Sequence, residues 1–279
     1  MKFKGTISVA LGLLLAVRAY PATPVTAENS WTESYAVTTP SPQLLVSNVW
    51  GSVTVRNGDS GEISVSVVEV RSAPDRRRYD LSLDIIRLDI EADSSGLSIV
   101  VGDRNERGHR MDECGGCRLD YQFEIQVPPG TTLDVGTVID GKVDIRGVTG
   151  LVSASNVNGP IRIDGLQDCE TINSANGRVD LQYSRAPVRD CSIETINGDV
   201  TLTIPTGSDM DVALDLFNGR VESEFQVSPF SLPTTVEHEI RNGHNQYRIQ
   251  QLSGVRIGAG GPTYSIASMN GDVRIQKHQ

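Results

Sequence analysis

The sequence predicts an all-β protein: a single-chain β-solenoid, similar to a right-handed parallel β-helix, with an antiparallel N-terminal portion. The first observation is periodicity. Apolar residues alternate with polar ones, and no segment keeps a 3.6-residue apolar period, so no helix longer than a turn or two is expected. The second is a repeated phrase: an apolar residue, then Asn, Asp or Trp, then Gly, then alternating apolar positions. Its seven copies have their glycines at Gly51, Gly141, Gly159, Gly177, Gly198, Gly219 and Gly271.

Residues 1–27 are predicted to be a secretory signal peptide. Lys2 and Lys4 provide a basic start, and the apolar run over 6–17 is too short to span a bilayer. Val25-Thr26-Ala27 offers a cleavage site after Ala27, and a competing site follows Ala19. The mature chain, residues 28–279, is therefore expected outside the cytoplasm as one domain without an integral membrane segment.

Residues 35–130 are expected to form the N-terminal strands of this domain. Period-two patterns cover 44–55, 63–70, 81–90, 97–101 and 121–127. The connections are rich in Gly, Pro, Asp and Ser, which is the chemistry of tight turns. Antiparallel pairing is therefore predicted here. The basic run over 76–78 is interpreted as a solvated loop.

Residues 131–279 are expected to form the regular rungs. Successive corners from 140 to 218 are 18, 18, 21 and 21 residues apart, which predicts units stacked at about 4.8 Å by parallel pairing. After most corners the second and fourth residues are apolar and should face the core. Asn-Gly is expected to supply the positive-φ residues of each corner. The longer step from 218 to 270 predicts an excursion around 230–247. The structural corner residues are predicted to be Gly51, Gly141, Asn158, Gly159, Asn176, Gly177, Asn197, Gly198, Asn218, Gly219, Asn270 and Gly271.

The four cysteines favour two disulfides. Cys169 and Cys191 precede the corners of neighbouring rungs by seven and six residues, so stacking brings them within bonding reach; two buried free thiols are the alternative. Cys114 and Cys117 favour a local disulfide in an exported protein. With His109 nearby they could also form half of a metal site, but a zinc site needs four ligands and the second pair is missing. A redox role and free thiols are the remaining alternatives, and no metal or cofactor is expected.

No catalytic residues are predicted. The segment 58–61, Gly-Asp-Ser-Gly, imitates a protease nucleophile, but all four histidines follow it, and a hairpin turn is the favoured interpretation. Paired carboxylates facing outward on the rungs could serve a polysaccharide-active enzyme. They alternate with a basic residue, however, which favours cross-strand ion pairs. The outward column reads Asp144, Arg162, Asp180, Thr201 and Glu222.

The net charge limits the partners. The formal charge is −10, and loss of residues 1–27 removes three basic residues and no acidic one, which brings it to −13. Such a surface repels nucleic acid and anionic headgroups. Nucleic-acid binding is therefore not expected.

The serial corner units, with the lead-in over 129–135 and the closing Gly-Gly-Pro at 260–262, resemble the bacterial putative-adhesin domains of unknown function. The resemblance covers most of residues 35–279. It implies a β-solenoid in a periplasmic, cell-surface or extracellular protein, with no known catalytic residues. We therefore expect a non-enzymatic, adhesin-like module that binds an extended envelope partner, glycan or protein. A polysaccharide-active β-helix enzyme and a structural or envelope-stress component are the alternatives.

Overall fold

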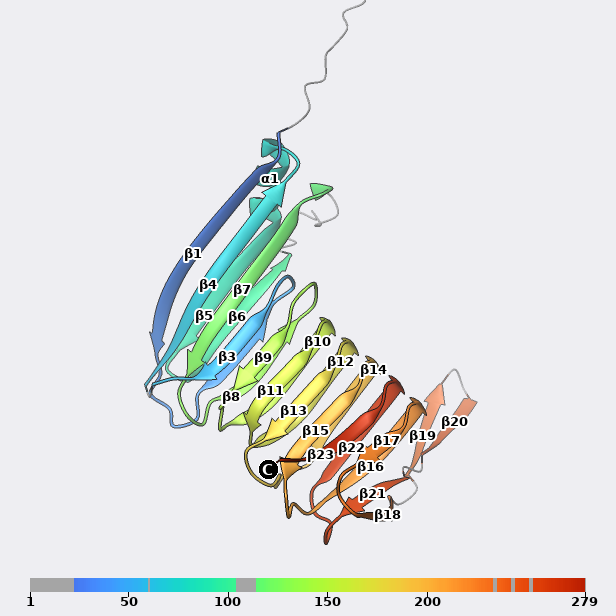
Figure 1. Cartoon of the computed structure of the whole chain (residues 1–279). Coiled ribbons are helices and arrows are strands. Elements are labelled where there is room, and N and C mark those ends of the chain that lie inside the picture. The colour runs from blue at the N-terminus through green and yellow to red at the C-terminus, as the bar shows by residue number, and fades with distance from the viewer. Residues whose placement is uncertain are drawn as a thin grey trace, which may run out of the picture.

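A computed structural model describes residues 23–59, 61–103, 114–232, 235–241, 244–250 and 253–278; of 235–241 and 244–250 it describes the backbone alone. Two large mixed sheets contain nearly all of these residues (Figure 1). Sheet A has ten strands, in the spatial order β1 (Val25–Ala36), β4 (Glu62–Ala73), β7 (Arg118–Val127), β3 (Val53–Asn57), β9 (Val143–Arg146), β11 (Ile161–Leu166), β13 (Val179–Tyr183), β15 (Val200–Pro205), β23 (Val273–His278) and β17 (Val221–Ser223).

Sheet B has eleven strands, and a separate hairpin pairs β19 (Thr235–Arg241) with β20 (His244–Gln250). The spatial order of sheet B is β18 (Val227–Ser231), β21 (Ser253–Ile257), β16 (Met210–Asn218), β22 (Thr263–Asn270), β14 (Cys191–Asn197), β12 (Asp168–Asn176), β10 (Leu151–Asn158), β8 (Thr132–Thr137), β2 (Gln43–Ser47), β6 (Gly96–Asp103) and β5 (Ile86–Asp93).

The chain passes from sheet B to sheet A at each repeated corner. In the centre, β8, β10, β12 and β14 pair in parallel, as do β9, β11, β13 and β15 on the other sheet. The apolar residues after most corners are buried as predicted, for example Val179 and Leu181, whereas Val221 after Gly219 is only partly buried. They join one hydrophobic core that extends from Val37 to Ile275. Aliphatic side chains alternating along both sheets therefore hold the two layers together.

The β-solenoid prediction, that of a parallel β-helix-like coil, is wrong. The described residues form two open mixed sheets rather than a closed coil, with antiparallel strands at the edges of both. The units also do not stack in chain order. The last unit, β22 and β23, lies between the units of β14–β15 and β16–β17. A corner motif fixes where the chain changes sheet, but not which unit becomes its neighbour.

Three N-terminal strands, β1, β4 and β7, are the longest that the structure describes. Strands β1 and β4 each have 12 residues and pair antiparallel, and β7 pairs antiparallel with β4. Figure 1 shows β1, β4 and β7 extending well beyond the short strands that follow in sheet A. This end of the molecule therefore rises as a wall beside the row of corners.

The ten-residue helix α1 (Arg76–Ile85) corrects three predictions: that no helix is longer than a turn or two, the solvated loop over 76–78, and the strand beginning at Leu81. Asp75 caps its N-terminus, since its side chain accepts a hydrogen bond from the backbone N–H of Arg78 at 2.9 Å. The buried guanidinium of Arg71 donates to the Ser82 hydroxyl at 3.1 Å and the Tyr121 hydroxyl at 3.2 Å. The buried Arg71 guanidinium of β4 thus holds α1 in place. The sequence of the helix itself gives no sign of this contact.

The C-terminal excursion adds edge strands. Strand β21 pairs antiparallel with β16 on one side and β18 on the other, and the β19–β20 hairpin lies within the predicted excursion. No helix of the described chain has the length and apolarity needed to cross a membrane.

Candidate interaction surface at the corner row

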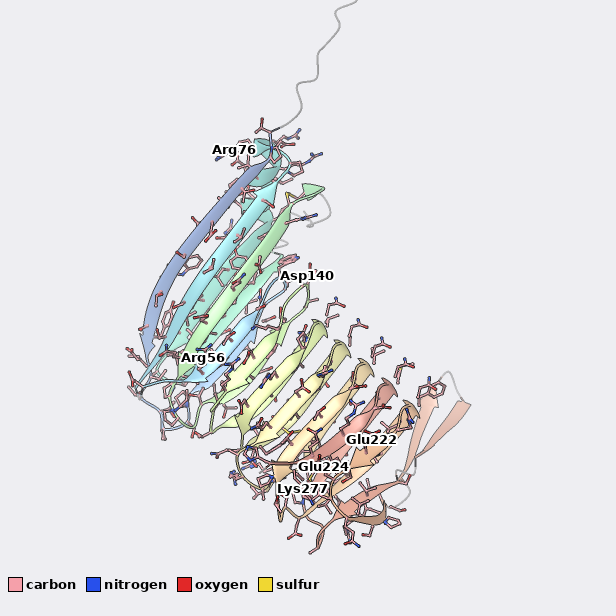
Figure 2. The ribbon with its side chains drawn as sticks, viewed as in Figure 1. Arg56, Arg76, Asp140, Glu222, Glu224 and Lys277 are labelled. Carbon is pink, nitrogen blue, oxygen red and sulfur yellow. A yellow bond between two sulfur atoms is a disulfide. The ribbon has the colours of Figure 1, made fainter. Side chains whose placement is uncertain are left out.

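The corner row is the line of turns at which the chain leaves sheet B for sheet A. Five of its seven members are Asn-Gly pairs, and their asparagines end β10, β12, β14, β16 and β22. The other two are Trp50-Gly51 and Asp140-Gly141, which lead into β3 and β9. Figure 2 shows side chains projecting along this row from one strand end after another. The row therefore presents similar groups at the spacing of the strands.

The five asparagines form a hydrogen-bonded ladder. Each bond runs from an amide nitrogen to an amide oxygen of the adjacent unit: Asn176 to Asn158 at 3.1 Å, Asn197 to Asn176 at 2.9 Å, Asn270 to Asn197 at 3.0 Å, and Asn218 to Asn270 at 3.0 Å. The asparagines lie at the ends of strands, and none of them has a positive φ. The expected positive-φ role for Asn is therefore wrong. The amide is present because it can donate to one neighbour and accept from the next.

The glycines are required by close backbone approach. A Cβ at Gly177 would lie 2.1 Å from the carbonyl oxygen of Gly159, and one at Gly198 would lie 2.0 Å from that of Gly177. Gly141, Gly219 and Gly271 are crowded in the same way. Positive φ adds a second reason at Gly51, Gly159 and Gly198, but not at the other four. At six of the seven corners the crowding atom is another glycine's carbonyl oxygen, whereas a Cβ at Gly51 would meet Asp120 and the backbone of Tyr121.

The residue before each corner pair forms an exposed apolar stripe. Five of these residues are large, and their exposed fractions run from 36 % to 79 %. They are Ile139, Val157, Ile196, Met269 and Phe217 in spatial order, with Ala175 between Val157 and Ile196. Contiguous exposed apolar residues on a protein surface indicate an interaction site. In these five units the first apolar position of the repeat therefore faces solvent.

A shallow groove of about 270 Å³ runs beside the stripe. Its lining includes Val157 and Ile196, and three partly or fully buried polar residues, Asn156, Ser174 and Thr195. The Thr195 hydroxyl and the Asn156 side-chain oxygen are buried without a hydrogen-bond partner among the described residues. The groove thus combines apolar walls with polar atoms that still have hydrogen-bonding capacity.

The outward column of sheet A differs from the expected ion-pair ladder. Arg162 does pair in register with Asp144 and Asp180, as predicted. However, Asp144 makes its ion pair with Arg146 on its own strand, at 2.7 Å. That hydrogen bond lowers the pKa of the Asp144 carboxyl, so this carboxylate stays ionised and engaged. Thr201 pairs in register with Arg274, and Arg274 lies 3.5 Å from Glu222.

Both predicted disulfides are present, Cys114–Cys117 and Cys169–Cys191. The second links β12 to β14 inside the core, where the Tyr183 hydroxyl lies 3.1 Å from the Cys169 sulfur. Burial raises the pKa of Tyr183 well above its usual value. Because Cys114 and Cys117 are bonded to each other, the metal-site alternative at this pair is excluded.

The remaining candidate residues for catalysis or metal binding are the serine of the segment 58–61 and the histidines. Ser60 and His109 lie outside the described residues, and so do the side chains of His238 and His244. Within the described chain, no group of three or more metal-ligating side chains comes together.

No known family model matches the chain, and no curated protein sequence matches it. Several solved structures are similar in outline. A putative cell adhesion protein from Clostridium sporogenes has 10 % identity and a TM-score of 0.43, over 90 % of this chain and 100 % of that one. A putative adhesin from Bacteroides fragilis has 11 % identity and a TM-score of 0.33, over 90 % and 97 %. A putative lipid binding protein from Parabacteroides distasonis has 8 % identity and a TM-score of 0.24, over 88 % and 96 %.

Proposed function

We propose that the protein is an exported, non-enzymatic, adhesin-like module of the bacterial envelope that binds an extended partner along the apolar stripe. The observation that supports this most directly is the stripe itself. It is one residue wide and crosses the ends of β10, β14, β22 and β16, with the smaller, half-buried Ala175 at β12. A compact partner would need a broader patch, since stable interfaces bury about 800 Å² on each partner.

The corner row also determines how the partner is recognised. Its backbone groups are already bonded between units, as in Gly177 N–H to the Asn197 carbonyl at 2.9 Å and Gly198 N–H to the Asn270 carbonyl at 2.9 Å. No further strand can therefore add there by backbone pairing, and recognition falls to side chains. The stripe supplies apolar contacts and the asparagine amides beside it supply polar ones.

Export is supported by the two disulfides, because disulfides form and persist in oxidising compartments. The predicted signal peptide lies largely outside the described residues, but residues 25–27 begin β1 and pair with Ala73, Ser72 and Arg71. Cleavage after Ala27 would remove these three pairs, whereas cleavage after Ala19 leaves β1 intact. We therefore propose the earlier site. N-terminal sequencing of the exported protein should begin at Tyr20, and a start at Glu28 would contradict this.

The stripe is tested by placing a charge on it. Ile196→Asp and Phe217→Asp should leave stability within about 0.5 kcal/mol of wild type because both side chains are exposed. They should weaken saturable binding of the labelled protein to isolated bacterial envelopes by about tenfold or more. Thr201→Asp, on the outer face of sheet A, is the matched control and should bind as wild type does. Equal binding by all three variants would refute the stripe as the binding surface.

A further inference from the structure

The two corners that depart from Asn-Gly line one and the same cavity. Trp50-Gly51 and Ile139-Asp140 both border a cavity of about 690 Å³. Its opposite wall comes from the long strands: Val70 and Ser72 of β4, and Arg118 to Asp120 of β7. Figure 1 shows β4 and β7 extending past β3 and β9 here, and Figure 2 shows Asp140 in the angle between them and the corner row. A regular repeat is therefore altered at the two places where it faces a hollow.

The backbone at Trp50 is held on several sides. Its N–H donates to the buried Asn48 side chain at 3.3 Å, and its carbonyl accepts from Tyr121 N–H at 2.9 Å. Asn48 itself donates to the Tyr121 carbonyl at 3.1 Å. The indole is partly buried against the core, so its position is set before any ligand arrives. Such pre-ordering lowers the entropic cost of binding.

Asp140 is excluded from the asparagine ladder. Instead of bonding to Asp140, the Asn158 amide donates to the carbonyl of Val138 at 3.3 Å. Among the described residues, the Asp140 carboxylate has neither a hydrogen bond nor an ion pair. Asp140 is also the described non-glycine residue with positive φ, at 53°, a conformation that costs about 1–3 kcal/mol unless its surroundings compensate. The exposed Asp140 carboxylate therefore makes no stabilising polar contact with the described residues and is available to a ligand.

The other polar groups of the cavity are also available. Asp120 accepts a hydrogen bond from Gln122 at 2.8 Å through one oxygen. Its other oxygen lies over Gly51, where a Cβ would come within 2.3 Å of it. Arg118 is exposed at the rim. The cavity thus combines an indole with two carboxylates and one guanidinium.

We infer that this cavity binds one neutral sugar ring of a glycan, whose chain continues from Ile139 along the apolar stripe. An indole provides an apolar face for the C–H groups of a sugar, while carboxylates accept from hydroxyls and a guanidinium donates to ring and hydroxyl oxygens. Two carboxylates against one cation leave the cavity negative, which disfavours uronic acids. The inference rests on the proposed function and specifies its partner as a neutral glycan rather than a protein.

Trp50 can report on its own site. The chain has two tryptophans, so Trp31→Phe leaves Trp50 as the sole indole. The probes are the tetramers of N-acetylglucosamine, glucose and galacturonic acid. At least one neutral tetramer should shift the Trp50 emission saturably, and the galacturonate tetramer should not. A flat titration with both neutral tetramers, or a shift with galacturonate alone, would overturn the inference.

Calorimetry with the neutral tetramer that binds assigns the residues. Trp50→Ala and Asp140→Asn should each weaken binding by about tenfold or more. Asp134→Asn, an exposed acid on β8 outside the cavity, is the matched control and should have no effect. Undiminished binding by the Trp50 variant would overturn the site.

The two proposals can fail separately. If no tetramer binds while Ile196→Asp still abolishes envelope binding, the sugar site alone is refuted. If a tetramer binds at Trp50 while the stripe variants bind envelopes normally, binding along the stripe is refuted and the sugar site at Trp50 stands.

Discussion

The five Asn-Gly corners and the two variant corners occupy equivalent places in the fold, yet their residues have different tasks. At the regular corners the side-chain amide of each asparagine hydrogen-bonds to an asparagine of an adjacent unit. Asn197, for example, donates to Asn176 and accepts from Asn270. At the variant corners, Trp50 lines a cavity and Asp140 has left the ladder. The repeated Asn-Gly residues therefore stabilise the fold, whereas Trp50 and Asp140, which replace Asn in the repeat, are available to contact a ligand.

The largest expected effect is at a regular glycine. Gly198→Val would place a branched side chain against a carbonyl oxygen that already lies 2.0 Å from the ideal Cβ position. Strain and overpacking together should cost about 3 kcal/mol or more of the free energy of unfolding, measured by chemical denaturation. Gly102→Val, where a Cβ meets nothing within 4 Å, is the control and should cost far less. A similar loss in the free energy of unfolding for both variants would refute the close-approach explanation.

The next effect separates the two disulfides. Cys169–Cys191 closes 22 residues and lies in the core, whereas Cys114–Cys117 closes three. In the chain-entropy estimate, replacing the first pair by alanines should cost about 3 kcal/mol and the second about half of that. Urea denaturation of the two double variants compares them directly. An equal or reversed order would contradict the prediction.

A moderate effect is expected for the ladder. Asn197→Ala removes one bond to each neighbouring asparagine and should cost about 1–2 kcal/mol. Asp140→Asn should cost nothing, since Asp140 takes no part in the ladder. Thermal melts of the two variants test this contrast between corner types, and a greater loss for Asp140→Asn would reverse it.

The smallest effect concerns an acid at a regular corner. Arg274 donates to Asp199 at 2.7 Å, and this hydrogen bond lowers the pKa of Asp199 below its usual 3.8. The stabilisation is present above the unfolded pKa and is lost as pH falls through the lower, folded pKa. Because both groups are about one third exposed, it should amount to less than about 1 kcal/mol. Asp199→Asn should therefore flatten the decline of stability below pH 4, and an unchanged decline would contradict it.

Local patterns in the sequence were sufficient to predict strands, corners and both disulfides. Period two placed Val179 and Leu181 in the core, and unit spacing brought Cys169 beside Cys191. Stacking order was not predictable. The long segment after Gly219 allows the last unit to return between two earlier ones, and nothing local encodes that choice.

The candidate site was predictable only in part. Helix α1 was missed because its buried residues, Tyr79, Ser82 and Ile85, are few and include a polar one, and because Arg71 anchors it from another strand. The stripe was not predicted, because an apolar residue at a strand end carries no local sign that it faces solvent. The substitution of Asn by Trp50 and Asp140 in the repeat was the available signal for the cavity, although the strands that form its other wall are distant in sequence.

The central claim is tested most directly by making all seven corners alike. The double variant Trp50→Asn/Asp140→Asn converts both variant corners to Asn-Gly. Calorimetric titration with the neutral tetramer that binds the wild type should show no binding, while the variant stays folded and loses only the stability that packing of the partly buried indole supplies. Retained binding, or unfolding of the double variant, would contradict the claim that the regular corners stabilise the fold while the two variant corners bind a ligand.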